Sequence, residues 1–177
     1  KVLDADCVLV AVGFRPNSGS LDLDRAGVKL DQRGHVLINN KFQTNVPTVY
    51  AIGDVCGAPY LAHKASKEGE IAAEVIAGHK AERDWRGMPA AIFTDPEIAT
   101  VGISEEQAKK DGREVKIGKF PYSVSGRAMS VGETEGFIKT ILDAKTHEVL
   151  GVGIVGHEAS DLINEAALAI EMCAFGE

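Results

Sequence analysis

Hydrophobic and polar positions follow different patterns in the two halves of this chain of 177 residues. Near the start, residues 6–12 form an unbroken apolar run after an acid, which is typical of a strand buried on both faces of a parallel sheet. Gly13 ends this run. Two shorter apolar segments, residues 35–40 and 48–52, predict two more short strands. The first half therefore has the pattern of an α/β fold.

Residues 61–78 repeat with the period of an amphipathic helix, and Gly78 is suited to end it. The two faces of this helix carry, on the apolar side, Ala62, Ala65, Ala72, Val75 and Ile76, and on the polar side, Lys64, Lys67, Glu68 and Glu70. No Ser, Thr, Asp or Asn directly precedes the helix, because residues 58–60 read Ala-Pro-Tyr. Its first N–H groups therefore need another partner, such as water, backbone or an electron-rich ligand.

The pattern changes after a charged stretch at residues 79–87, where we place a domain boundary. Beyond it, short apolar segments predict strands at residues 90–94, 98–101, 115–120, 137–142 and 149–155. The last two flank a polar turn and predict a hairpin. Ser104 and Gln107 form a capping box that starts a helix. A final helix over residues 158–175 completes an α+β pattern, in which helices cover one face of antiparallel strands.

Composition and charge narrow the class of protein. Lys and Arg number 19 against 26 Asp and Glu, and the net charge of −7 argues against a nucleic-acid partner. No apolar run predicts a membrane span, and the first residues lack the pattern of a signal peptide. Cys7, Cys56 and Cys173 are too far apart in sequence for a CxxC pair or a metal site. We expect three buried structural thiols in a reducing compartment, either the cytoplasm or a mitochondrial matrix.

The candidate chemistry lies where residues 48–52 end in Gly53 and Asp54. Ligands bind at the carboxyl ends of strands in α/β sheets. A glycine lets a ligand approach the backbone, and a carboxylate accepts hydrogen bonds from ligand hydroxyls. His63 falls in the first turn of the helix that follows. The alternative is a plain strand end, with Asp54 as a turn residue and His63 packed or solvated. Residues 94–97 are interpreted only as a turn between strands.

Several segments together resemble the flavin-dependent disulfide oxidoreductases. The central ones are residues 11–17 (AVGFRPN), 49–54 (VYAIGD) and 61–69 (LAHKASKEG). Further segments resemble the interface domain of the same family, at residues 93–97, 101–102, 125–128 and 132–134. The Leu-Ala-His-Lys-Ala sequence is the most specific part, and it is most similar to the branch of the family that oxidises dihydrolipoamide.

The resemblance implies FAD and NAD as cofactors. Asp54, after Gly53, would bind the ribityl chain of FAD. Backbone N–H groups near the flavin pyrimidine edge would come from Tyr60, Leu61, Ala62 and His63. Gly13 would lie beside the nicotinamide nucleotide, although Phe14 replaces the basic residue usual there. The family's redox-active cysteine pair and catalytic histidine would lie outside residues 1–177, so we expect no catalytic residue here and no activity from this segment alone.

The resemblance also divides the chain. Residues 1–17 would end a Rossmann-like NAD-binding domain, residues 18–87 would form a FAD-contacting central segment, and residues 88–177 would form the interface domain. A homodimer is implied, with a lipoyl domain of a 2-oxoacid dehydrogenase complex as a further partner. The apolar stripe that favours the dimer is Leu162, Ala166, Ala169 and Cys173. Two alternatives stay open: a non-catalytic dimerisation module, and a related flavoprotein such as an NADH oxidase or a mercuric or glutathione reductase.

Overall fold

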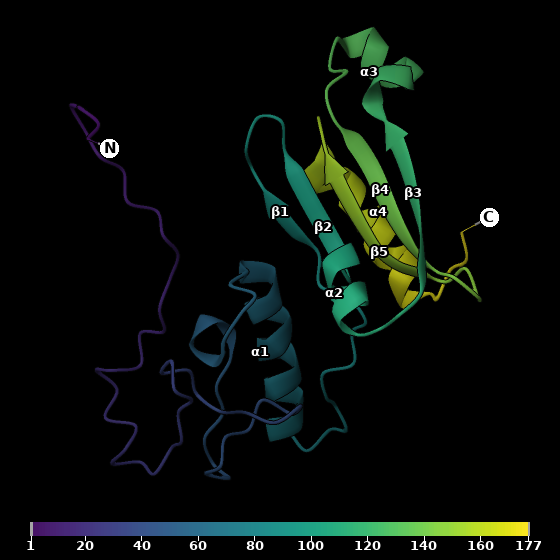
Figure 1. Ribbon diagram of the computed structural model, residues 1–177. Helices are drawn as coiled ribbons and strands as arrows, with labels where there is room; N and C mark the ends of the chain where they lie inside the picture. Colours follow the sequence, from purple (N-terminus) through teal and green to yellow (C-terminus); the bar gives the residue numbers. More distant parts are fainter. Residues whose placement is uncertain (1, 177) are drawn as a thin grey trace. The chain divides into compact units, whose positions relative to one another are not determined.

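The computed structural model describes residues 2–176. The chain divides into two compact units, Lys1–Arg83 and Asp84–Glu177, at a point inside the charged stretch. Figure 1 shows that helices and strands are sparse in the first unit and dense in the second. The finer division of the first unit at residue 17 stays a prediction.

The first unit is built mainly from turns around a small apolar core. Its regular elements are the short 3-10 helix η1 (Gly53–Cys56) and the helix α1 (Ala62–Ile76). Phe42 is only 1% exposed, and Ile71 and Ala72 of α1 are also buried. Gly78 follows the helix with a φ of +87°, the left-handed conformation expected of a residue that ends a helix. The predicted helix and its end are therefore confirmed.

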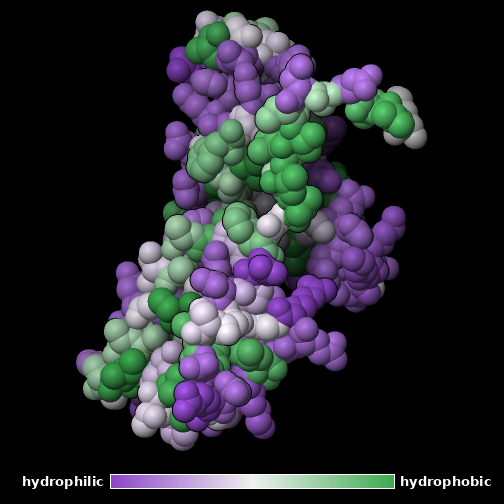
Figure 2. All heavy atoms as spheres, turned by 90° about the vertical axis from the view of Figure 1, so that its left-hand side faces the viewer, coloured by the Kyte–Doolittle hydropathy of each residue, from purple (hydrophilic) through white to green (hydrophobic). Residues whose placement is uncertain are grey.

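The three strands predicted in the first unit do not form. Residues 6–12 pair with no other described segment, and their side chains are exposed, with Leu9 at 89% and Val12 at 91%. Figure 2 shows hydrophobic side chains of this N-terminal segment standing out from the surface. A buried parallel strand needs neighbouring strands for its N–H and C=O groups, and residues 2–176 supply none beside it.

The other two predicted strands are reduced to single bridges. Val36 pairs with Leu30, and Tyr50 pairs with Gln43. Loop-like backbone bonds hold the rest, such as Val36 N–H to the Val55 carbonyl at 2.8 Å. Val36 is buried, but Leu37 and Ile52 are exposed, and closely spaced turns leave no length for a ladder.

The second unit is a five-stranded antiparallel sheet in the order β1-β2-β5-β4-β3. Its strands are β1 (Ala90–Ile92), β2 (Ile98–Gly102), β3 (Val115–Pro121), β4 (Phe137–Asp143) and β5 (Val149–Val155). The helix α4 (Ala159–Glu171) packs against β1, β2 and β5, as Figure 1 shows. Antiparallel strands with a covering helix confirm the α+β prediction for this half.

The core of the second unit lies between the sheet and α4. The helix contributes Ala159, Ile163 and Ile170, and Ile163 is 2% exposed. The strands contribute Ala99, Val101, Val152 and Ile154. β4 and β5 pair along their length with one irregularity at Ile141 and Leu142, as expected of a hairpin.

Helix starts in the second unit are satisfied by side chains. Ser104 accepts a hydrogen bond from Gln107 N–H at 3.0 Å and caps α2 (Glu105–Lys110), as the capping box predicted. The sequence pattern missed α3 (Gly126–Val131), which Ser125 caps in the same way. It also missed that Glu97 caps α4: its Oε2 accepts from Ser160 N–H at 2.9 Å, and this bond lowers the Glu97 pKa. Residues 94–97 are therefore more than a turn.

Candidate functional site

The candidate site is the corner where residues 48–52 lead into η1. Gly53 is buried and has a φ of +75°, a left-handed conformation that glycine adopts without strain. A Cβ at this position would lie 3.2 Å from the Ala65 Cβ, so the loop packs directly on the first turns of α1. Asp54, the next residue, is exposed. The corner thus presents a carboxylate to solvent from a closely packed backbone.

The start of α1 lies next to this loop and has no side-chain cap. Leu61 occupies the cap position and makes no capping hydrogen bond, as the sequence predicted. Ala62 and His63 are exposed in the first turn. A helix start without a side-chain cap and the positive end of the helix dipole favour negative charge at this place.

Lys64 and Glu68 tie the two features together, which corrects their predicted place on the polar face. Their side chains are 5% and 6% exposed, and Lys64 Nζ lies 3.5 Å from Glu68 Oε1. Gly53 N–H donates to Glu68 Oε2 at 2.6 Å, and Lys64 Nζ donates to the Gly57 carbonyl at 2.9 Å. The two side chains are buried because loop backbone groups, rather than water, are their partners. Residues 64, 68, 71 and 72 follow the spacing of one helix face, and Ile71 and Ala72 are buried on that face. The sequence therefore contained a pattern that predicts burial of Lys64 and Glu68.

Tyr60 is held by a chain of polar side chains that the sequence analysis did not single out. Its hydroxyl lies 2.9 Å from His35 Nε2, and His35 Nδ1 lies 3.0 Å from Asp31 Oδ2. The His35 backbone N–H also donates to Asp31, which lowers the pKa of that carboxyl. Phe14 meets Tyr60 edge to face, with ring centroids 6.2 Å apart. The segment after Gly13 and the residue before Leu61, predicted to face different cofactors, are therefore in contact.

The cysteines form no redox or metal site within the described part of the chain. All three are free, and no cluster of His, Cys, Asp and Glu suited to a metal occurs among residues 2–176. Burial raises the pKa of the Cys56 thiol to about 11, and the nearby Glu68 carboxylate adds to this rise. Cys7 is exposed, which corrects the expectation that all three thiols are buried. It lies on the N-terminal run, where no other residue of the range 2–176 covers it.

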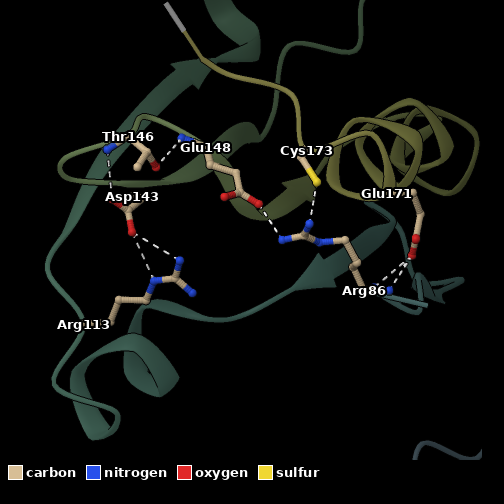
Figure 3. Close-up of polar contacts among 8 residues, drawn as sticks. Arg86, Arg113, Asp143, Thr146, Glu148, Glu171 and Cys173 are labelled. Carbon is tan, nitrogen blue, oxygen red and sulfur yellow. Dashed lines mark hydrogen bonds and ion pairs between the residues drawn. The ribbon is translucent and has the colours of Figure 1, made fainter. Parts of the chain in front are cut away.

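A second polar cluster lies in the second unit around Arg86, drawn in Figure 3. The backbone N–H of Arg86 donates to Glu171 Oε1 at 2.7 Å. Its guanidinium contacts Glu148 Oε1 at 2.6 Å and the Cys173 sulfur. On the same hairpin, Asp143 accepts from the Lys145 and Thr146 N–H groups, and these bonds lower its pKa to about 2. Arg86 pairs with Glu148, and Glu171 accepts backbone N–H groups, so these contacts join segments of the second unit that are distant in sequence.

Hydrophobic side chains of the second unit remain exposed at positions suited to an interface. Leu162 of the predicted stripe is 42% exposed, whereas Ala166, Ala169 and Cys173 are half-buried. The other large apolar residues left exposed in this unit are Ile92, Phe93, Ile117, Phe120, Val124, Met129, Val131, Leu168, Met172 and Phe175. A hollow of about 270 Å³ lies between Phe120, Val131, Ile138 and Leu162.

Comparison with known proteins shows which protein family the chain resembles. A model of pyridine nucleotide-disulphide oxidoreductases matches residues 1–69, and the dimerisation-domain model of the same family matches residues 88–175. Dihydrolipoyl dehydrogenase of Bacillus subtilis is 50% identical over 171 residues, which are 97% of this chain and 36% of the relative. That of Thermus scotoductus is 53% identical over 169 residues, 96% of this chain and 36% of the relative. The chain thus spans about a third of the length of these curated relatives.

Solved structures agree with this relationship. The HOCl-induced flavoprotein disulfide reductase RclA from Escherichia coli superposes with a TM-score of 0.84 at 25% identity, covering 93% of this chain and 38% of RclA. LpdA from Mycobacterium tuberculosis gives a TM-score of 0.82 at 28% identity, covering 91% of this chain and 35% of LpdA. Within the described residues, no helix combines the length and apolar character needed to cross a bilayer.

Proposed function

The chain belongs to the pyridine nucleotide-disulphide oxidoreductase family, and we propose that it is the part of a dihydrolipoyl dehydrogenase that completes the flavin site and forms the dimer interface. Similarity to dihydrolipoyl dehydrogenases over almost the whole chain carries this proposal. The full protein would oxidise dihydrolipoamide and reduce NAD. The bacterial relatives support a location in the cytoplasm.

The corner around Asp54 fits FAD. The exposed Asp54 carboxylate is an acceptor for the ribityl hydroxyls, and the absence of a Cβ at Gly53 lets the loop that carries Asp54 pack on Ala65 of α1. The uncapped start of α1, from Leu61 to His63, offers N–H groups where the flavin pyrimidine edge carries negative charge. Bound there, FAD would supply the electron transfer between a dithiol and NAD. The residues of this chain bind and orient it, and we assign none of them a catalytic role.

Gly13 and Tyr60 extend this site toward the nicotinamide. Gly13 has a φ of +105° and open space where a Cβ would stand, which suits a backbone beside a nucleotide. Phe14 packs on Tyr60, and His35 holds the Tyr60 hydroxyl. This contact fixes the segment proposed to bind NAD, at Gly13, relative to the segment proposed to bind the flavin, at Tyr60.

The second unit is proposed to pair with a second copy. Its exposed apolar side chains, Leu162 among them, need a cover that the described residues do not supply. The lipoyl domain of a 2-oxoacid dehydrogenase complex is the proposed further partner of the full protein. Light scattering at micromolar concentration should give a dimer, and a monomer at high micromolar concentration would contradict this part of the proposal.

The flavin assignment is tested by Asp54→Ala in the full-length protein, with Glu74→Gln on the exposed face of α1 as the control. A hydrogen bond to a charged group contributes about 1.5–3 kcal/mol, so FAD should bind the Asp54 variant roughly ten- to a hundredfold more weakly. Apoenzyme titration with FAD measures this. Equal affinity of variant and parent would show that Asp54 is only a turn residue. Turnover with dihydrolipoamide, compared with glutathione and mercuric ion, separates the proposed substrate from those of related reductases.

A further inference from the structure

The buried pair of Lys64 and Glu68 has no part in the function proposed so far. Exposed ion pairs on the same helix, such as Lys67 with Glu70, need no explanation, because their side chains are 54% and 67% exposed. Lys64 and Glu68 are at least nine-tenths buried. Removing two charges from water is costly, and apolar residues of similar volume usually stabilise a fold as well or better. The pair therefore calls for a role that apolar side chains do not fill.

That role is visible in what the two side chains bind. Glu68 accepts the N–H of Gly53, the first residue of η1, at 2.6 Å. Lys64 donates to the carbonyl of Gly57, the residue directly after η1, at 2.9 Å. The pair thus holds both ends of the loop that carries Asp54. The thiol of Cys56, within the same loop, has a pKa raised to about 11 by burial, so it adds no charge beside the pair.

The same two residues are fixed relative to the uncapped helix start. Lys64 is the third residue of α1, which begins at Ala62, and Glu68 is one turn further on. A helix is stiff over one turn, so a loop bound to residues 64 and 68 keeps a set position relative to the N–H groups at residues 62 and 63. The carboxylate and the helix start are the two features to which we assign FAD.

We propose that Lys64 and Glu68 are positioning residues for the flavin, which hold the Gly53–Gly57 loop so that Asp54 and the start of α1 keep one relative geometry. This inference rests on the proposed flavin site. The pair touches neither the ribityl chain nor the flavin ring in this account and acts only through the loop.

The test uses full-length apoenzyme carrying Glu68→Gln or Lys64→Met, with Glu70→Gln and Lys67→Met as the matched exposed controls. The measurements are the dissociation constant for FAD and the visible circular dichroism of the bound flavin. Both buried-pair variants should bind FAD about tenfold or more weakly and alter the dichroism, while both controls stay within about twofold of the parent. Lys64→Arg, which keeps a cationic donor, should lie closer to the parent than Lys64→Met.

A buried-pair variant that melts earlier yet binds FAD with the parent's affinity and dichroism would overturn the inference, because the pair would then only stabilise the fold. If Lys64→Met fails to fold, Glu68→Gln decides, since it keeps the size of the side chain but removes the negative charge that pairs with Lys64. Asp54→Ala separates the two proposals. Weak FAD binding by Asp54→Ala with normal binding by Glu68→Gln overturns this inference alone, whereas normal binding by Asp54→Ala overturns the flavin site and this inference with it.

Discussion

The two units of the chain are stabilised in different ways. The second unit has a five-stranded sheet covered by α4, an apolar core and side-chain caps on α2, α3 and α4. The described part of the first unit has no sheet. It has the helix α1 without a side-chain cap, two isolated β-bridges, and the buried ion pair of Lys64 and Glu68. A unit that satisfies its own backbone groups is suited to stand as a scaffold. A unit with an exposed carboxylate beside a helix start that has no side-chain cap is suited to receive a ligand.

The largest effect that sharpens this contrast is expected in the core of the second unit. Ile163→Ala removes a side chain that is 2% exposed, and such a change costs about 2–5 kcal/mol in the free energy of unfolding. In hydrogen-exchange measurements, the amides of the sheet and α4 should lose protection, and those of α1 should keep it. Leu162→Ala, at the neighbouring exposed position, should cost far less. Equal losses in both units would mean that they unfold as one body.

A cap added to the first unit should stabilise it and weaken its proposed function. Leu61→Asp places a carboxylate at the uncapped start of α1, and a good cap contributes about 1 kcal/mol. Exchange of the first-turn amides in the apoenzyme should slow about fivefold, while FAD binds more weakly because its N–H partners are taken. Leu61→Ala is the control, since Ala is a poor cap. Tighter FAD binding by Leu61→Asp would contradict the assignment.

Removal of the Arg86 side chain should have a smaller and more local effect. Arg86→Ala breaks the contacts to Glu148 and Cys173 drawn in Figure 3, although Glu171 still receives the backbone N–H. Partly exposed ion pairs contribute about 0.2–1 kcal/mol. The Gly176 N–H, which donates to the His147 carbonyl, and the Val149 N–H, which donates to the Ala174 carbonyl, should therefore exchange up to about fivefold faster. Faster exchange throughout α4 would show a wider role.

Acid sensitivity offers the finest comparison. The Asp143 pKa of about 2 lies below its ordinary value of 3.8, because the folded hairpin donates hydrogen bonds to the carboxylate. Its contribution to stability is therefore complete above about pH 4 and is lost as the pH falls toward 2. Urea unfolding of the parent and of Asp143→Asn should differ more at pH 5 than at pH 2.5. A difference independent of pH would contradict the lowered pKa.

The contrast between the units also explains what the sequence predicted. The hairpin of β4 and β5 could be read because each strand finds its partner next along the chain. Residues 6–12 have an equally clear pattern, but pattern alone does not supply the neighbours that a parallel strand needs. The corner of Gly53 and Asp54 and the missing cap of α1 were readable, since both depend on local residues.

Polar side chains with distant partners could not be placed in this way. Glu97 caps a helix 63 positions away in the chain, and no local signal marks it. Lys64 and Glu68 were assigned to solvent because charged residues are rarely buried. The helical spacing of Lys64 and Glu68 with Ile71 and Ala72 places all four residues on the buried face of α1. An assignment by residue type alone places the two charged residues on the exposed face instead.

The central claim is that the Gly53–Gly57 loop and the start of α1 together form the FAD-binding site of the first unit. Hydrogen exchange of the full-length protein, measured residue by residue with and without FAD, tests it most directly. The amides at residues 53–65 should gain the largest protection when FAD binds, and the strand amides of β2 and β5 should change little. Unchanged exchange at residues 53–65 in the presence of saturating FAD would contradict the account.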